Sequence, residues 1–346
     1  MAEEKKQKRW KIILNTITLI ALVLLVYLVR HDVVETIAKI NDVKWWILLL
    51  MIPAQGLNFY TYALMYSDLL KFLGNKIKTS KLFRITLELN FVNHVFPSGG
   101  VSGFSYFSLR LKPLDVTTGK STLIQMLRFV LIFISFQVLL AFGVLSLAFS
   151  GSVNNFVLLI AGSIATLLIA GTLLLTYIVG SKQRINIFFT SLTRFINKAL
   201  SVIRPKNPET ISIERAQKAF NELHENYLLI KKDYGILRKP LMHSFFANLT
   251  EVITLYLVFV AFGFWVNPGA VILAYAVANF AGLISVLPGG VGVYEALMTA
   301  VLTSAGVPAG ISFPVVIMYR VLTMIMQLLP GYILYHKAVQ NNDVKL

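Results

Sequence analysis

Five ionisable side chains lie inside long apolar stretches of this 346-residue chain: Glu88, Arg128, Glu251, Glu295 and Arg320. A charge at membrane depth is costly, so such residues pair with one another or serve a function. Salt bridges from Glu88 to Arg128 and from Glu295 to Arg320 would tie neighbouring segments together. Alternatively, the two guanidinium groups would bind an anionic headgroup. Glu251 has no evident partner in the sequence and is a candidate proton carrier.

Two short stretches interrupt the apolar sequence with the same residue types. Each has an Asn-Phe pair, an apolar run, a proline and then glycines, at 90–107 and 279–298. Proline and glycine break helices, and a break at membrane depth exposes backbone N–H groups that favour an anion. The residues predicted to form these breaks are Pro97, Gly99, Gly100, Pro288, Gly289, Gly290 and Gly292.

The composition indicates an all-α polytopic membrane protein. Hydrophobic residues make up 56% of the chain, the mean hydropathy is +0.71, and several apolar runs are long enough to cross a bilayer. The net charge of +16 does not imply nucleic acid, because the basic residues gather in the segments between alternate spans. By the positive-inside bias these segments, and both termini, are cytoplasmic. The absence of cysteine excludes disulfides and thiolate metal sites.

The apolar runs and the charges predict six full spans and two re-entrant hairpins. The spans cover about 12–29, 45–66, 122–149, 155–178, 241–262 and 313–335. Basic residues flank the hairpin at 85–109 on both sides, so it enters from the cytoplasm, whereas uncharged turns flank the hairpin at 268–305, which enters from outside. Reading each hairpin as two short spans gives the alternative of eight or more spans.

The two halves share one plan in opposite orientations, which predicts an inverted repeat. The first repeat is 1–149 and the second is 150–346, with a cytoplasmic helical insert at 180–240. Arg128 lies 31 residues after Pro97, and Arg320 lies 32 after Pro288. The insert contains two amphipathic helical patterns, which suit either an interfacial hairpin on anionic lipid or a connector packed on the spans.

Within this architecture, the predicted substrate site lies where the two hairpins meet. Its expected members are Arg128, Arg320, Glu295, Glu88, Asn90, Asn279 and Tyr319. No catalytic triad, phosphate loop or metal cluster is visible in the sequence, so we expect no cofactor, and His94 suits a polar packing role better than catalysis. The basic N-terminus lacks a cleavage site, so the first span is expected to be retained.

At these motifs the chain resembles the lysylphosphatidylglycerol synthetase/flippase transmembrane family, which includes the membrane half of the multiple peptide resistance factor. The resemblance rests on PGGVGVYEA at 288–296, YRVLTMIMQLLPG at 319–331 and, more loosely, NFVNHVFPSGG at 90–100. Members commonly have Gly-Glu after the first proline, whereas here Val101 follows Gly100.

The resemblance implies lipid handling, in connection with antimicrobial peptide resistance, in the bacterial plasma membrane. The expected function is a flippase that moves an anionic phospholipid, a polyprenyl-phosphate carrier or lysyl-phosphatidylglycerol between leaflets. The alternatives are a component of phosphatidylglycerol lysyl transfer and a non-transporting lipid-binding scaffold. Because the chain ends eleven residues after the last predicted span, the soluble lysyl-transfer domain is expected to be absent. The expected partners are membrane lipids, a separate lipid-modifying enzyme and a second copy of the chain.

Overall fold

A computed structural model describes residues 43–95, 101–151, 154–188, 190–191, 213–284 and 292–341. The regular elements in these ranges are all helices. The predicted first span, at 12–29, lies outside the described residues, as do Pro97, Gly99, Gly100, Pro288, Gly289 and Gly290.

Five stretches of helix are long and apolar enough to cross a membrane. They match the five predicted spans that fall within the described ranges. Their helices are α2 (Trp45–Leu49) with α3 (Met51–Phe72), α6 (Thr118–Phe149), α7 (Asn155–Val179), α10 (Arg238–Ala261), which follows the 3-10 turn η3 (Tyr234–Leu237), and α13 (Ala309–Gln340). The chain is therefore a multi-pass, all-helical membrane protein.

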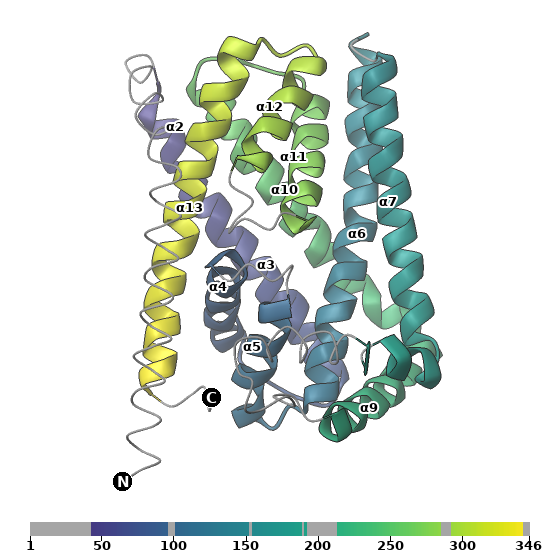
Figure 1. Ribbon diagram of the computed structural model, residues 1–346. Helices are drawn as coiled ribbons and strands as arrows, with labels where there is room; N and C mark the ends of the chain where they lie inside the picture. The colour runs from purple at the N-terminus through teal and green to yellow at the C-terminus, as the bar shows by residue number, and fades with distance from the viewer. Residues whose placement is uncertain are drawn as a thin grey trace, which may run out of the picture.

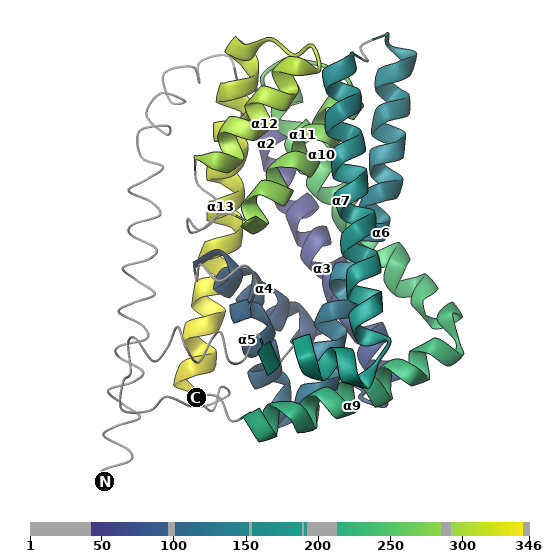
Figure 2. The ribbon, with the colours of Figure 1, turned by 45° about the vertical axis from the view of Figure 1, so that its right-hand side comes forward.

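Two pairs of shorter helices lie at opposite ends of this bundle (Figures 1 and 2). The helices of one pair, α4 (Thr79–Val95) and α5 (Val101–Leu111), lie at the lower end of Figure 1. Those of the other, α11 (Pro268–Ile284) and α12 (Val293–Ser304), lie at the upper end. Within each pair the two helices pack against one another.

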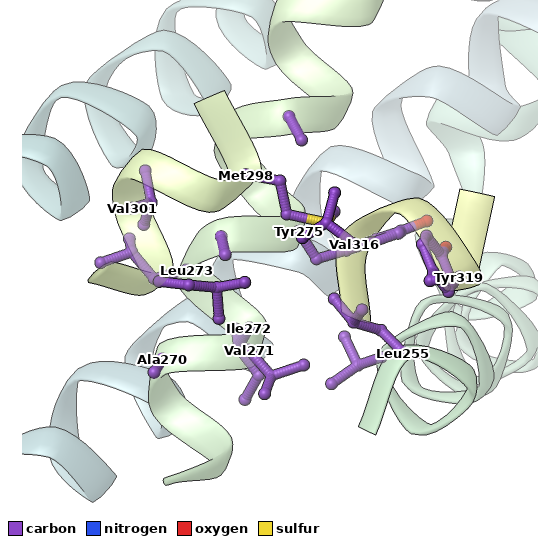
Figure 3. Close-up of a cluster of buried hydrophobic side chains, with 14 of the residues drawn as sticks. Leu255, Ala270, Val271, Ile272, Leu273, Tyr275, Met298, Val301, Val316 and Tyr319 are labelled. Carbon is purple, nitrogen blue, oxygen red and sulfur yellow. The ribbon is translucent and has the colours of Figure 1, made fainter. Parts of the chain in front are cut away.

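Each short pair packs on the long helix of the other half of the chain. Helix α4 lies against α13, and α11 lies against α6. The upper core, drawn in Figure 3, includes Leu273 of α11, Met298 of α12 and Val316 of α13. The lower core includes Phe91 of α4 and Tyr335 of α13, whose rings are 5.5 Å apart. The two halves are thus interlocked at both ends.

Glycine permits the closest approach at both of these crossings. A Cβ atom on Gly269 of α11 would lie 2.1 Å from the carbonyl oxygen of Gly143 on α6. A Cβ atom on Gly331 of α13 would lie 2.8 Å from the carbonyl oxygen of Leu87 on α4. Because backbone occupies the space a side chain would need, both crossings depend on the missing Cβ.

Helix α9 (Ile213–Lys232) runs across the lower end of the bundle, beneath α6 and α7 (Figure 2). Leu223 and Ile230 are buried in the lower core, the hydroxyl of Thr117 donates to Glu222, and His224 contacts the carbonyl oxygen of Val179. This helix fits the expected connector packed on the spans. Most of the other amphipathic pattern of the insert lies outside the described residues.

Candidate functional site

The first buried ion pair joins Glu88 of α4 to Arg110 of α5. The guanidinium donates from Nε and Nη2 to the two carboxylate oxygens, at 2.6 and 3.0 Å, and Tyr106 adds its hydroxyl at 2.8 Å. Both charged side chains are less than a tenth exposed. The expected Glu88–Arg128 pair is therefore wrong. Helix α5 lies between α4 and α6 in the chain, and one turn separates Tyr106 from Arg110, so α5 presents both groups to Glu88.

The second buried pair joins Glu295 of α12 to Arg320 of α13, as the sequence predicted. The Nε of Arg320 donates to one carboxylate oxygen at 2.7 Å, and the backbone N–H of Gly292 donates to the other at 2.6 Å. Gly292 has a φ of +85°, which glycine adopts freely, and it begins α12 with Glu295 in the first turn. Arg320 also stacks on the ring of Tyr294, 4.1 Å from its centroid.

Arg128 of α6 forms no ion pair with any carboxylate that the structure describes. Its Nη1 donates to Gln125 at 3.4 Å, a long contact, and its guanidinium lies over the rings of Tyr62 and Phe129, 5.4 and 5.3 Å from their centroids. The Nε atom is buried and has no hydrogen-bond partner in the described part of the chain. A buried donor without a partner is uncommon, so Arg128 has capacity to bind an anion.

Glu251 of α10 is held by neutral groups. One carboxylate oxygen accepts from Gln55 of α3 at 3.1 Å and from Tyr319 of α13 at 3.3 Å. No basic side chain forms a salt bridge with Glu251 within the described ranges.

A chain of side-chain amides connects Glu251 to the first short pair. Asn90 of α4 donates to Gln327 of α13 at 3.2 Å, and Gln327 donates to Gln55 at 3.0 Å. Gln55 then donates to Glu251, so every donor along the chain points toward this carboxylate. His94 contacts the backbone one turn earlier on the same helix, where its Nδ1 lies 2.9 Å from the carbonyl oxygen of Asn90.

The structure brings together part of the predicted site. Glu251, Tyr319 and Asn90 share the amide chain, and Asn279 lies beside it, donating to the carbonyl oxygen of Tyr275 and, at 3.4 Å, to the hydroxyl of Tyr294. Arg128 adjoins this region through Tyr62, whereas Glu88 is engaged with Arg110. Within the described ranges, no group of three or more histidine or acidic side chains could hold a metal ion.

Sequence reasoning missed Arg110, Gln55 and Gln327. Arg110 lies in the sequence close to Lys112 and Lys120, in a basic segment, and this pattern predicts a solvent-exposed residue, whereas the structure buries it in the last turn of α5. Gln55 and Gln327 each lie inside a predicted span. A polar amide within an apolar run is the feature that could have identified them as members of the site.

The packed membrane helices surround two ion pairs together with Glu251 and Arg128. The chain is therefore a multi-pass membrane protein with a polar site between its helices. Residues 13–331 match the family described as the lysylphosphatidylglycerol synthase TM region. The chain belongs to this family.

Relatives described as UPF0104 membrane proteins occur in archaea. One from Methanothermobacter thermautotrophicus is 36% identical over 80 residues, which are 23% of this chain and 24% of the relative. One from Pyrococcus horikoshii is 23% identical over 199 residues, 57% of this chain and 58% of the relative. One from Methanocaldococcus jannaschii is 21% identical over 276 residues, 77% of this chain and 76% of the relative. The chain thus aligns with less than two thirds of the first two proteins.

Proposed function

We propose that this protein moves an anionic lipid between the leaflets of the cell membrane, and that Arg128 binds the lipid phosphate. The observation that carries the proposal is the buried Nε atom of Arg128, which lacks a hydrogen-bond partner, on a side chain that lacks a carboxylate partner among the described residues. Arg110 and Arg320, in contrast, each form a salt bridge with a glutamate. A phosphate oxygen would supply the acceptor that the Nε of Arg128 lacks.

The opposite placement of the two short helix pairs supports alternating access to this site. In this proposal α4–α5 and α11–α12 are the two hairpins of an inverted repeat, and Arg128 lies between them at membrane depth. The order of helix lengths supports this proposal, since α3 to α6 and α10 to α13 are each a long helix, two shorter helices and a long helix. Movement of one hairpin and its supporting long helix relative to the other would open the site to each leaflet in turn.

The distribution of charge supports an orientation with both termini in the cytoplasm. The turns at the upper end of Figure 1, at 262–267 and 305–308, carry no charged residue. Basic residues gather at the lower end, at 71–84, 110–120 and 231–239. The positive-inside bias therefore assigns the lower end to the cytoplasm.

Replacing Arg128 with Gln is expected to reduce leaflet exchange at least about tenfold, the effect of removing a charge-assisted bond worth about 1.5–3 kcal/mol. The test uses liposomes containing the purified protein and labelled phosphatidylglycerol, lysyl-phosphatidylglycerol or a short polyprenyl phosphate. The lipid exchanged by the wild-type protein identifies the substrate. Arg128→Lys should retain part of the activity, because it keeps the charge but loses the planar donor fork.

Arg184→Gln is the matched control. Arg184 also stacks on a tyrosine, 3.7 Å from the ring centroid of Tyr177, but it follows the end of α7 and lines a surface pocket with Ile187 and Phe188. This variant should exchange lipid at the wild-type rate. Equal exchange by Arg128→Gln and the wild-type protein would contradict the phosphate-binding role of Arg128, and no exchange of any of the three lipids by folded wild-type protein would contradict the proposed function.

A further inference from the structure

The polar centre contains one acidic and one basic side chain that form no salt bridge among the described residues. Glu88 and Arg110 neutralise one another, as do Glu295 and Arg320. Glu251 and Arg128 remain, with opposite charges. The two are linked through α3: Gln55 donates to Glu251, and Tyr62, two turns further along the helix, has its ring centroid 5.4 Å from the guanidinium carbon of Arg128. The centre is therefore neutral when Glu251 is ionised and no ligand is bound.

The groups that face Glu251 from the surrounding helices carry no compensating charge. Gln55 of α3 and Tyr319 of α13 form hydrogen bonds to it, and Arg320, which follows Tyr319 on α13, forms a salt bridge with Glu295. The ionised group that α6 contributes is Arg128, whose guanidinium lies over the ring of Tyr62. On α10 itself, His243 forms a separate contact with Asp68 at 3.3 Å, about two turns closer to the basic end. Helix α2 and the turn η3 contact α10. Near α2, the backbone N–H of Lys44 donates to the carbonyl oxygen of Ala261, the last residue of α10.

A bound lipid phosphate would change this charge balance. A phosphodiester headgroup such as phosphatidylglycerol carries one negative charge, and at Arg128 it would neutralise the guanidinium. The carboxylate of Glu251 would then be a partly buried negative charge without compensation, which is unfavourable at membrane depth. Uptake of one proton from water converts the carboxylate to a neutral carboxylic acid and restores neutrality.

We infer that Glu251 couples proton uptake to lipid binding at Arg128, so that one proton travels with each singly charged anionic lipid and in the same direction. The inference rests on the proposed lipid transport and specifies its driving force. An inward proton gradient would move such a lipid from the outer to the inner leaflet.

The amide chain gives protonation a structural consequence. Its donors all point toward Glu251 and favour the ionised carboxylate. A protonated carboxyl is itself a donor; when its proton lies on the oxygen that accepts from Gln55, the amide of Gln55 must turn its own oxygen toward Glu251. Gln327 and Asn90 must then reverse in succession, which transmits the protonation state of α10 through α13 to α4. Proton uptake is thereby linked to the hairpin whose movement would open the site.

The test uses liposomes containing the full-length protein and labelled phosphatidylglycerol, with the membrane potential clamped at zero. With a gradient of about one pH unit, the wild-type protein should concentrate the label about tenfold in the leaflet facing the alkaline side, since one proton is coupled to one lipid. Glu251→Gln keeps an oxygen that accepts from Gln55 and Tyr319, but it cannot take up a proton. This variant should retain measurable lipid-for-lipid exchange and produce a leaflet ratio of about one at every gradient.

Glu225→Gln, a change at an exposed acidic residue of α9, is the matched control and should concentrate the label like the wild-type protein. Accumulation by Glu251→Gln, or a wild-type leaflet ratio that follows a sodium gradient and ignores pH, would overturn the inference while leaving lipid transport intact. Absence of exchange by the wild-type protein would instead overturn the proposed function.

A second measurement requires no variant. In weakly buffered detergent solution, binding of phosphatidylglycerol to the wild-type protein should take up about one proton per lipid bound, measured with a pH-sensitive dye. Lysyl-phosphatidylglycerol has a net positive headgroup, so Glu251 would remain ionised and no uptake is expected. Equal proton uptake with the two lipids, or none with phosphatidylglycerol that binds, would overturn the inference.

Discussion

Replacement of Arg110 with Met is expected to lower the free energy of unfolding by about 3–5 kcal/mol, the effect of removing one partner from a buried ion pair. Glu88 would keep the hydroxyl of Tyr106 at 2.8 Å but lose both bonds from the guanidinium. The remaining carboxylate is almost completely buried, with 3% of its side chain exposed, so water cannot replace them. Titration of the detergent-solubilised protein with a denaturing detergent would measure the change.

The double variant Glu88→Leu/Arg110→Met separates loss of the pair from exposure of a buried charge. It removes both charges and leaves the Tyr106 hydroxyl without its acceptor, so its free energy of unfolding should lie within about 2 kcal/mol of the wild-type value. A double variant as unstable as Arg110→Met would show that lost packing, rather than the unpaired carboxylate, causes the defect.

Replacement of Gly269 with Val is expected to prevent stable packing of α11 on α6. A Cβ atom at this position would lie 2.1 Å from the carbonyl oxygen of Gly143 and 2.8 Å from Cγ of Leu147, so the backbones of both helices must separate. Overpacking typically costs about 1–3 kcal/mol, and we expect this contact to exceed that range because backbone atoms cannot rotate away. The readouts are the yield of monodisperse protein by size-exclusion chromatography and the melting temperature.

Two alanine variants, one expected to destabilise the protein and one serving as a control, test this prediction further. Gly331→Ala should also destabilise the protein, through the corresponding crossing of α13 and α4, where the new Cβ would meet Cβ of Phe91 at 2.7 Å. Gly162→Ala is the matched control on α7, where no atom lies within 4 Å, and it should raise the free energy of unfolding by about 0.5–1 kcal/mol. Equal melting temperatures for all three variants would mean that neither crossing depends on glycine.

The sequence predicted the Glu295–Arg320 pair but not the partner of Glu88, for a geometric reason. Helices α12 and α13 are consecutive and packed together, and both residues lie about three turns from the connection between them, so they reach the same depth. Glu88 precedes its proline, whereas Glu295 follows its own, so the two glutamates are not equivalent positions. The regular spacing of Arg128 and Arg320 after the prolines therefore did not identify the partner of Glu88, which is Arg110.

The five long helices were predictable because apolar length alone decides which segments can cross a bilayer. The amide chain was not predictable in the same way. Its contacts join residues 237 and 272 positions apart, and they depend on how α3, α4 and α13 pack. Of its amides, Asn90 alone was predicted from the sequence to belong to the site, and no local pattern indicated that Gln55 and Gln327 would join it.

The interlocking of the halves constrains how the protein is made. Helix α4 is completed long before α13, the helix on which it packs, has left the ribosome. Until then, the faces carrying Asn90 and Phe91 lack their partners on α13, and a membrane insertase or lipid must shield them. We therefore expect protection of α4 from proteolysis to appear only late in synthesis, after α13 has entered the membrane.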